Sequence, residues 1–262
     1  MKKLLALVLS LAMVFSLCAC GSSGGAKPET SGTEAPAEEA AEASTGVKDT
    51  LIIGTDTDIN NLNLQQQSTA NNNIILKCTH QNLVYFNNDP NAETRFDPGL
   101  ATSWEFTDDT HIVMKLRDDV HFNDEAKTPF TAADAVFTLE SAFSDESKVK
   151  SALAGFVGVK AVDDYTIEIE IETYNNEFVA SLSSLPLAMQ SKAAWESGME
   201  EPWYIGTGPY KFESWEEGVC CRLVRVDDYW GENLPEDHPF AAGPSKAIEF
   251  RPFLEASSRV IA

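Results

Sequence analysis

Few residues of this sequence have the types and spacing that chemistry requires. The histidines lie far apart along the chain, without the close spacing of metal ligands: His80, His111, His121 and His238. Cys220 and Cys221 are adjacent, so on a strand they would point to opposite faces. Paired acids such as Asp227-Asp228 are expected by chance in so acidic a chain, and we interpret them as solvated turns.

Known catalytic signatures are also missing from the sequence. It has no nucleophile elbow, zinc-protease helix, phosphate loop or Cys-x-x-Cys pair. Gly206-Thr207-Gly208 begins like a dinucleotide fingerprint, but Pro209 follows and no third glycine arrives. We interpret the two glycines as a turn in which a Cβ would obstruct, with Pro209 stiffening the return into a strand. We therefore expect no enzyme, no metal site and no cofactor.

Composition narrows the function classes further. The 262 residues include 41 Asp and Glu against 19 Lys and Arg, a formal net charge of −22. Nucleic acid is excluded as a partner, because binding phosphates requires clustered Lys and Arg. With 43% hydrophobic and 10% aromatic residues, the bulk of the chain is not of the disordered type. The length allows one large domain or two medium ones.

The first residues are typical of an export signal. Lys2 and Lys3 precede an apolar run over residues 4–19, which is shorter than the roughly 20 residues of a membrane span. The run ends in Leu17-Cys18-Ala19-Cys20, which resembles the bacterial lipobox. The resemblance implies that residues 1–19 are a lipoprotein signal peptide and that Cys20 carries the lipid. The protein would then be anchored on the extracytoplasmic face of the cell membrane.

After Cys20 the composition changes twice. Residues 20–48 are rich in Gly, Ser, Ala, Pro, Thr and Glu, which predicts a disordered acidic linker. From Thr50 the pattern becomes that of a globular domain. Thr131 with Asp134 predicts a capped helix start, and Asn71 to Asn73 offer cap side chains to a short helix at 74–76.

Several strands complete a mixed α/β (α+β) pattern. Leu51-Ile52-Ile53-Gly54 is a short apolar run that predicts a buried strand. Residues 165–172 alternate strictly between apolar and polar side chains, and residues 112–116 do so in part, as half-buried strands do. Three further strands are expected at 210–215, 219–226 and 247–253.

Four blocks in this order resemble one large family. The stretch 97–105 (DPGLATSWE) is similar to its "P-x-L-A-x-S-W-E" signature, and residues 116–122 and 129–137 are similar to the block that follows. Residues 206–212 (GTGPYKF) and 228–230 (DYW) match its later marks. On these residues the chain is identified as a member of the peptide/nickel-type extracytoplasmic solute-binding proteins, family 5, which serve ABC importers.

The resemblance implies a fold and a division of the chain. Members have a class II periplasmic-binding-protein-like fold of two lobes, with the ligand between them. Residues 49–80 and 186–262 would form an incomplete first lobe, and residues 81–185 an inserted subdomain. Members are about twice as long, so we expect an N-terminal fragment from which the second lobe is missing.

The resemblance also implies a function. We expect the solute-binding subunit of an ABC importer, a monomer that captures peptides and delivers them to membrane permease subunits. By family analogy the ligand contacts of this part come from Ser68, Thr69 and Ala70. The loop 123–127 departs from the family by lacking the usual Asp-Gly. Two alternatives stay open: another solute, such as a nickel complex or a sugar, or a truncated surface lipoprotein without a transport role. The lipid anchor and acidic linker are the arrangement expected in a Gram-positive bacterium.

Overall fold

The computed structural model describes residues 48–66, 69–236 and 238–254. These described residues form one compact unit. The predicted signal peptide, Cys20, the predicted linker up to residue 47, and Ser68 lie outside the described residues, so the predictions made for them stay predictions.

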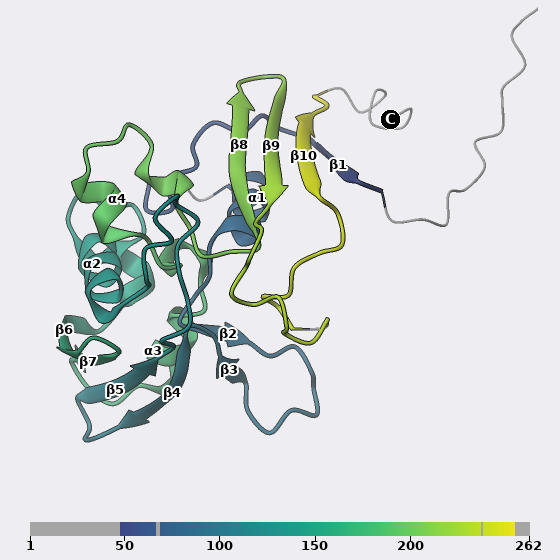
Figure 1. The fold of residues 1–262 in the computed structure, drawn as a ribbon. Helices are drawn as coiled ribbons and strands as arrows, with labels where there is room; N and C mark the ends of the chain where they lie inside the picture. The colour runs from purple at the N-terminus through teal and green to yellow at the C-terminus, as the bar shows by residue number, and fades with distance from the viewer. Residues whose placement is uncertain (1–47, 67–68, 237, 255–262) are drawn as a thin grey trace, which may run out of the picture. The chain divides into compact units, whose positions relative to one another are not determined.

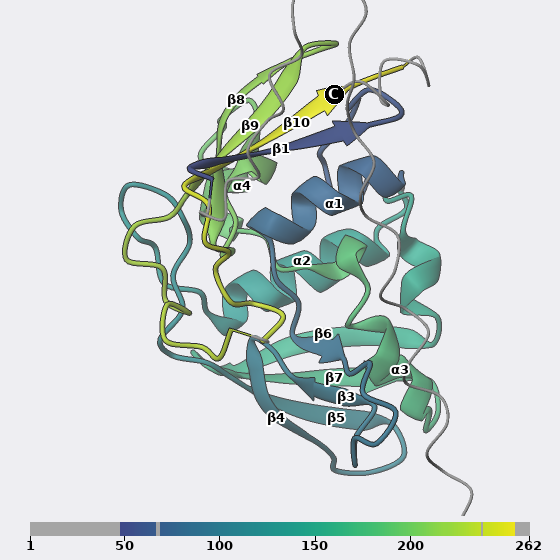
Figure 2. The ribbon, with the colours of Figure 1, turned by 90° about the vertical axis from the view of Figure 1, so that its right-hand side faces the viewer.

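Sheet A contains the first and last strands of the described chain (Figure 1). Its strand order is β1 (Thr50–Thr55), β10 (Ala247–Pro252), β9 (Cys220–Arg225) and β8 (Tyr210–Glu216). β1 runs parallel to β10, and the other neighbours are antiparallel. Helix α1 (Ala70–Thr79) packs its buried Ile75 and Leu76 into the same core as Leu223 and Phe250 of the sheet. Figure 2 shows α1 lying along the sheet beneath β1.

Sheet C is formed by the middle of the chain. Its order is β4 (Ala101–Phe106), β5 (His111–Leu116), β7 (Thr166–Ile171) and β6 (Phe156–Asp163), with all neighbours antiparallel. Helix α2 (Ala132–Phe143) packs against it and buries Leu139 in a second core. Sheet B is the short hairpin of β2 (Val84–Phe86) and β3 (Phe96–Pro98).

The remaining elements are short. They are α3 (Asn176–Ser181), α4 (Lys192–Glu196) and the 3-10 turns η1 (Lys150–Leu153), η2 (Leu185–Leu187) and η3 (Pro202–Tyr204). The mixed α/β class expected from the sequence is confirmed. The division into a first lobe and an inserted subdomain stays a prediction.

The predicted start of α2 is confirmed in detail. Thr131 and Asp134 form a capping box, in which the Asp134 carboxylate accepts from the Thr131 backbone N–H at 2.9 Å. The same carboxylate accepts from the backbone N–H of Lys192 at 2.9 Å, which ties α2 to the start of α4. Burial raises the pKa of Asp134, and these donors oppose that shift. One acidic side chain therefore fixes two helix starts.

Two predictions about the first strand and the first helix are wrong. Leu51 and Ile52 are 43% and 52% exposed, although β1 was expected to be buried. The reason is that β1 is an edge strand, and Ile52 stands beside Glu249 on the face opposite to buried Phe250. Asn71 to Asn73 do not cap a helix at 74–76, because they lie inside α1, whose N-cap is Thr69.

The Gly206–Gly208 turn lies against the end of α1. A Cβ on Gly206 would stand 2.0 Å from the carbonyl oxygen of Thr79, and one on Gly208 would stand 2.6 Å from that of Cys78. Asn123 reaches the same turn, since its backbone N–H donates to the Gly206 carbonyl at 2.9 Å and its side chain donates to the Gly208 carbonyl at 2.8 Å. The steric role expected for the two glycines is thus confirmed.

Candidate functional site

The parallel pair β1 and β10 brings two strand ends to one edge of sheet A. At this edge the backbone N–H of Phe253 donates to the carbonyl of Thr55 at 2.8 Å. The hydroxyl of Thr55 donates to the Thr57 carbonyl at 2.9 Å, which turns the chain away from the sheet. In open sheets with parallel strands, ligands bind outside the carboxyl ends of the strands. The carboxyl edge of β1 and β10 is therefore the candidate binding site.

Helix α1 begins at the same edge. The side-chain amide of Asn71, in its first turn, donates to Asp56 Oδ1 at 2.9 Å and to Thr57 Oγ1 at 2.5 Å. One residue on, the amide of Asn72 donates to Asn60 Oδ1 at 3.1 Å. The asparagines thus hold the segment after β1 against the helix start, which is the role they have instead of capping.

The N-terminus of α1 combines a helix start with one neighbouring acid. Helices present free N–H groups and a partial positive charge at their N-termini, and although the first turn of α1 contains no acidic residue, Asp56 Oδ1 lies 2.9 Å from the Asn71 side-chain amide in that turn. Thr69 and Ala70 are exposed there, next to Asn71, whose side chain bonds to Asp56 and Thr57. The structure therefore places two of the three residues predicted to contact ligand at the helix start, although their role as ligand contacts stays a prediction.

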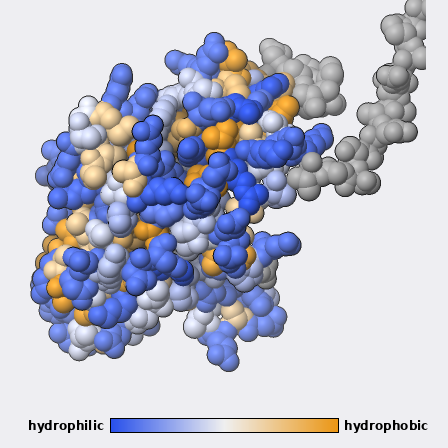
Figure 3. Space-filling model, viewed as in Figure 1, coloured by the Kyte–Doolittle hydropathy of each residue, from blue (hydrophilic) through white to orange (hydrophobic). Residues whose placement is uncertain are grey.

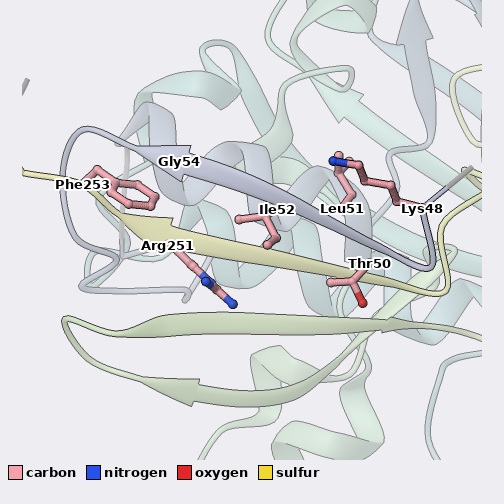
Figure 4. A pocket seen from close by; sticks show the side chains of 7 residues that line it. All are labelled: Lys48, Thr50, Leu51, Ile52, Gly54, Arg251 and Phe253. Carbon is pink, nitrogen blue, oxygen red and sulfur yellow. The ribbon is translucent and has the colours of Figure 1, made fainter. Parts of the chain in front are cut away.

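A hollow of about 460 Å³ lies along β1 and β10 (Figure 4). Seven residues line it: Lys48, Thr50, Leu51, Ile52, Gly54, Arg251 and Phe253. Thr69 and Ala70 are not among them, so the hollow is separate from the predicted contacts. The sequence did not predict this hollow, because the apolar run of β1 was interpreted as a buried strand. No partner strand could be assigned to β1 from the sequence, and this was the one sign that its side chains could be exposed.

Burial keeps three titratable side chains uncharged near neutral pH. Burial lowers the pKa of His80 to about 4 and raises that of the Cys78 and Cys221 thiols to about 11 and 12. Among the described residues, no group of three or more His, Cys, Asp or Glu is arranged to hold a metal ion. Within the same residues, no helix has the length and apolar character to cross a membrane.

A family model matches this chain. It is described as "Bacterial extracellular solute-binding proteins, family 5 Middle" and matches residues 95–262. Among curated proteins, the glutathione-binding protein GsiB of Pectobacterium atrosepticum is 28% identical over 165 residues, which are 61% of this chain and 30% of that protein. The chain thus spans about a third of the length of this relative.

Solved structures show the same fold. The murein tripeptide-binding protein MppA of Escherichia coli superposes with a TM-score of 0.69 at 22% identity, over 82% of this chain and 45% of that chain. The protein MoaA from A. tumefaciens R10, solved with mannopinic acid, gives a TM-score of 0.72 at 23% identity, over 82% and 43% of the two chains. The expected fold, that of part of a two-lobe binding protein, is confirmed.

The four sequence blocks lie within residues 97–230, which the family model also matches. Because the model matches more than half of the residues, the chain belongs to the bacterial extracellular solute-binding proteins of family 5.

Proposed function

We propose that this chain carries part of the solute site of an ABC importer's binding subunit, and that the solute is a peptide. The observation that carries the proposal is the carboxyl edge of β1 and β10, where α1 begins without an acidic residue in its first turn. A peptide has a carboxylate that suits such a helix start and an amino group that suits an acid such as Asp56.

The relatives support this class of solute. GsiB and MppA are described as binding glutathione and a murein tripeptide, and both ligands are short peptides with free carboxylates. In the proposed mechanism, two lobes close on the solute by a hinge motion and present it to a membrane permease. The described residues supply one side of this cleft.

A second solute class has its own support. MoaA of the same fold was solved with mannopinic acid, which is not a peptide, so a different small acid would suit the same helix start. The sequence left open a nickel complex or a sugar as well, and also a truncated surface lipoprotein without a transport role. Lipid anchoring through Cys20 on the extracytoplasmic face of a Gram-positive cell membrane is part of the proposal.

The test uses two variants, each of which adds one negative charge at a different position of α1. Ala70→Glu puts a carboxylate at the exposed helix start, where it repels a bound carboxylate. Ile74→Glu puts the same charge on the same helix one turn later, at a side chain that is 45% exposed. Both variants are titrated with a pool of tripeptides and followed by NMR shift changes, which detect weak binding.

We expect the unsubstituted chain to show saturable shifts in residues 55–57 and 69–73. Ala70→Glu should weaken binding about tenfold, equivalent to about 1.4 kcal/mol, whereas Ile74→Glu should leave it unchanged. Equal affinities for all three proteins would remove α1 from the site. Binding of mannopinic acid but of no peptide would favour the second solute class.

A further inference from the structure

We propose that Gln65 is a positioning residue for solute binding, because its buried side chain ties helix α2 to the loop between the two halves of the candidate site. These halves are residues 55–57 and 69–73, and residues 58–66 lie between them along the chain. The contacts that hold residues 58–66 therefore decide how the two halves face each other. The inference rests on the proposed function, since it concerns the affinity of that same site.

Gln65 lies in an unusual place for a glutamine. Hydrophilic side chains gather on the surface, as the face in Figure 3 shows, and glutamine is usually among them. Gln65 is only 7% exposed. Its side-chain amide donates to the carbonyl of Thr138, in the middle of α2, at 3.0 Å. A polar group is costly to bury unless it is hydrogen-bonded, so this bond fixes where the side chain lies.

The backbone at Gln65 is held as well. Its carbonyl accepts from the backbone N–H of Lys148 at 3.0 Å, and its own N–H donates to Asn63 Oδ1 at 3.0 Å. The side chain of the next residue, Gln66, donates to the carbonyl of Glu146 at 2.7 Å. This end of the loop therefore lies against α2 and the segment that follows α2.

The other part of the loop is bonded to α1. Asn72, in the first turn of α1, is fully buried. Its side-chain amide donates to Asn60 Oδ1 at 3.1 Å and to the carbonyl of Asn61 at 2.5 Å. The loop thus connects the start of α1, on one side, with α2 on the other.

Gln65 also links the two cores of the molecule. Leu62 and Leu64 of the loop are buried in the core of sheet A, whereas Leu139, next to Thr138, is buried in the core of sheet C. The amide of Gln65 is a buried, directional bond between these two apolar clusters. Without this bond, the loop stays attached to α1 but loses its bond to the body of α2. Locally open states of the loop and of the start of α1 then become more populated.

The test compares two substitutions that remove different bonds made at the same position of α2. Gln65→Met keeps the length of the side chain and removes the amide donor. Thr138→Val removes the hydroxyl, which donates to the Asp134 carbonyl at 2.8 Å and accepts from the Gln190 N–H at 3.0 Å, but keeps the carbonyl to which Gln65 bonds. Each variant loses buried hydrogen bonding, so both should have a lower urea midpoint than the unsubstituted chain. Only Gln65→Met alters the loop.

Two properties are measured for each protein: the affinity for a pool of tripeptides, from NMR shift changes, and amide hydrogen exchange without tripeptides. Gln65→Met should weaken binding at least about fivefold and speed exchange in residues 59–66 and 70–73 by a similar factor. Thr138→Val should change neither property in these segments, although it is less stable. Equal losses of affinity in the two variants would assign the effect to stability and would overturn the proposal.

A milder variant tests the same attachment if Gln65→Met does not fold. Gln66→Ala removes only the bond to the Glu146 carbonyl, which lies in an exposed position. It should speed exchange in residues 59–66 in the same direction by a smaller factor. Unchanged exchange there would overturn the attachment of the loop as described.

The exchange measurement separates this inference from the proposed function. If the unsubstituted chain binds no tripeptide, the proposed function fails, and faster exchange in Gln65→Met still supports Gln65 as the residue that orders the loop. If tripeptides bind but Gln65→Met exchanges and binds like the unsubstituted chain, the positioning role of Gln65 is wrong and the proposed function stands.

Discussion

Strand β7 in sheet C and strand β1 in sheet A are both rich in isoleucine, yet they lie in opposite environments. Ile167 and Ile169 of β7 are fully buried between β5 and β6, under α2. Ile52 of β1 is 52% exposed, with a neighbour on one side only. The difference shows that burial of a strand is decided by what lies on both of its sides, and that composition alone does not determine it.

The two sheets also differ in their edge strands. Sheet C ends in two edge strands with bulges, whereas sheet A ends in one bulged strand and in β1, whose register with β10 is unbroken. Among the described residues, β1 is therefore the one edge strand of these two sheets without a bulge.

The largest effect is expected at Gly206, where the loop that carries Asn123 meets the end of α1. Gly206→Ala brings a Cβ to within 2.0 Å of the Thr79 carbonyl, so backbone must move. We expect a loss of at least about 4 kcal/mol in the free energy of unfolding, measured by urea denaturation. Gly158→Ala is the control, since a Cβ there meets nothing within 4 Å. A loss under 1 kcal/mol in Gly206→Ala would mean that the turn is not fixed as described.

The comparison itself is tested by truncating one isoleucine in each strand. Ile169→Ala removes fully buried methyl groups and should lower the free energy of unfolding by about 2–4 kcal/mol. Ile52→Ala removes half-exposed ones and should cost under about 0.5 kcal/mol. If the two costs were equal, Ile52 would be as enclosed as Ile169.

His80 provides a pH dependence. Burial lowers its pKa from 6.5 to about 4, so the unfolded chain takes up the proton first as the pH falls. The stability that comes from keeping His80 neutral is complete above pH 6.5 and is lost towards pH 4, by about 3 kcal/mol. Unfolding curves measured at several pH values should show this loss of stability. The loss should be smaller in the variant His80→Gln. Identical pH profiles for His80→Gln and the unsubstituted chain would contradict the assignment.

The smallest effect is expected at the start of α2. Thr131→Ala removes the hydroxyl of the capping box and should cost about 1 kcal/mol, measured as a shift in the denaturation midpoint. Thr131→Ser keeps the hydroxyl and should retain most of this stability. A serine variant as unstable as the alanine variant would assign the loss to the missing methyl group instead.

Much of the fold could be predicted from the sequence where local pattern and packing agree. The alternation in residues 166–171 placed Ile167 and Ile169 in the core, and Thr131 with Asp134 marked the start of α2. For β1 the apolar run gave the strand but not its exposure, because exposure depends on β10, which lies almost 200 residues further along the chain. The same holds for Asn71 and Asn72, which bond to residues 56–61 across a loop.

The candidate site was less accessible to sequence reasoning than the fold. The family resemblance pointed to Ser68, Thr69 and Ala70, and the structure places the latter two at the start of α1. Nothing in the local sequence shows that Asp56 and Thr57 lie against the first turn of α1, because that contact depends on the path of the chain after β1 and on the Asn71 side chain.

The central claim, that the carboxyl edge of β1 and β10 with the start of α1 binds a peptide, is tested most directly by amide hydrogen exchange. The chain is labelled with and without a saturating pool of tripeptides, and protection is compared segment by segment. We expect slower exchange in residues 55–57 and 69–73 and no change in β6 and β7. No protection at the start of α1, or protection confined to sheet C, would contradict it.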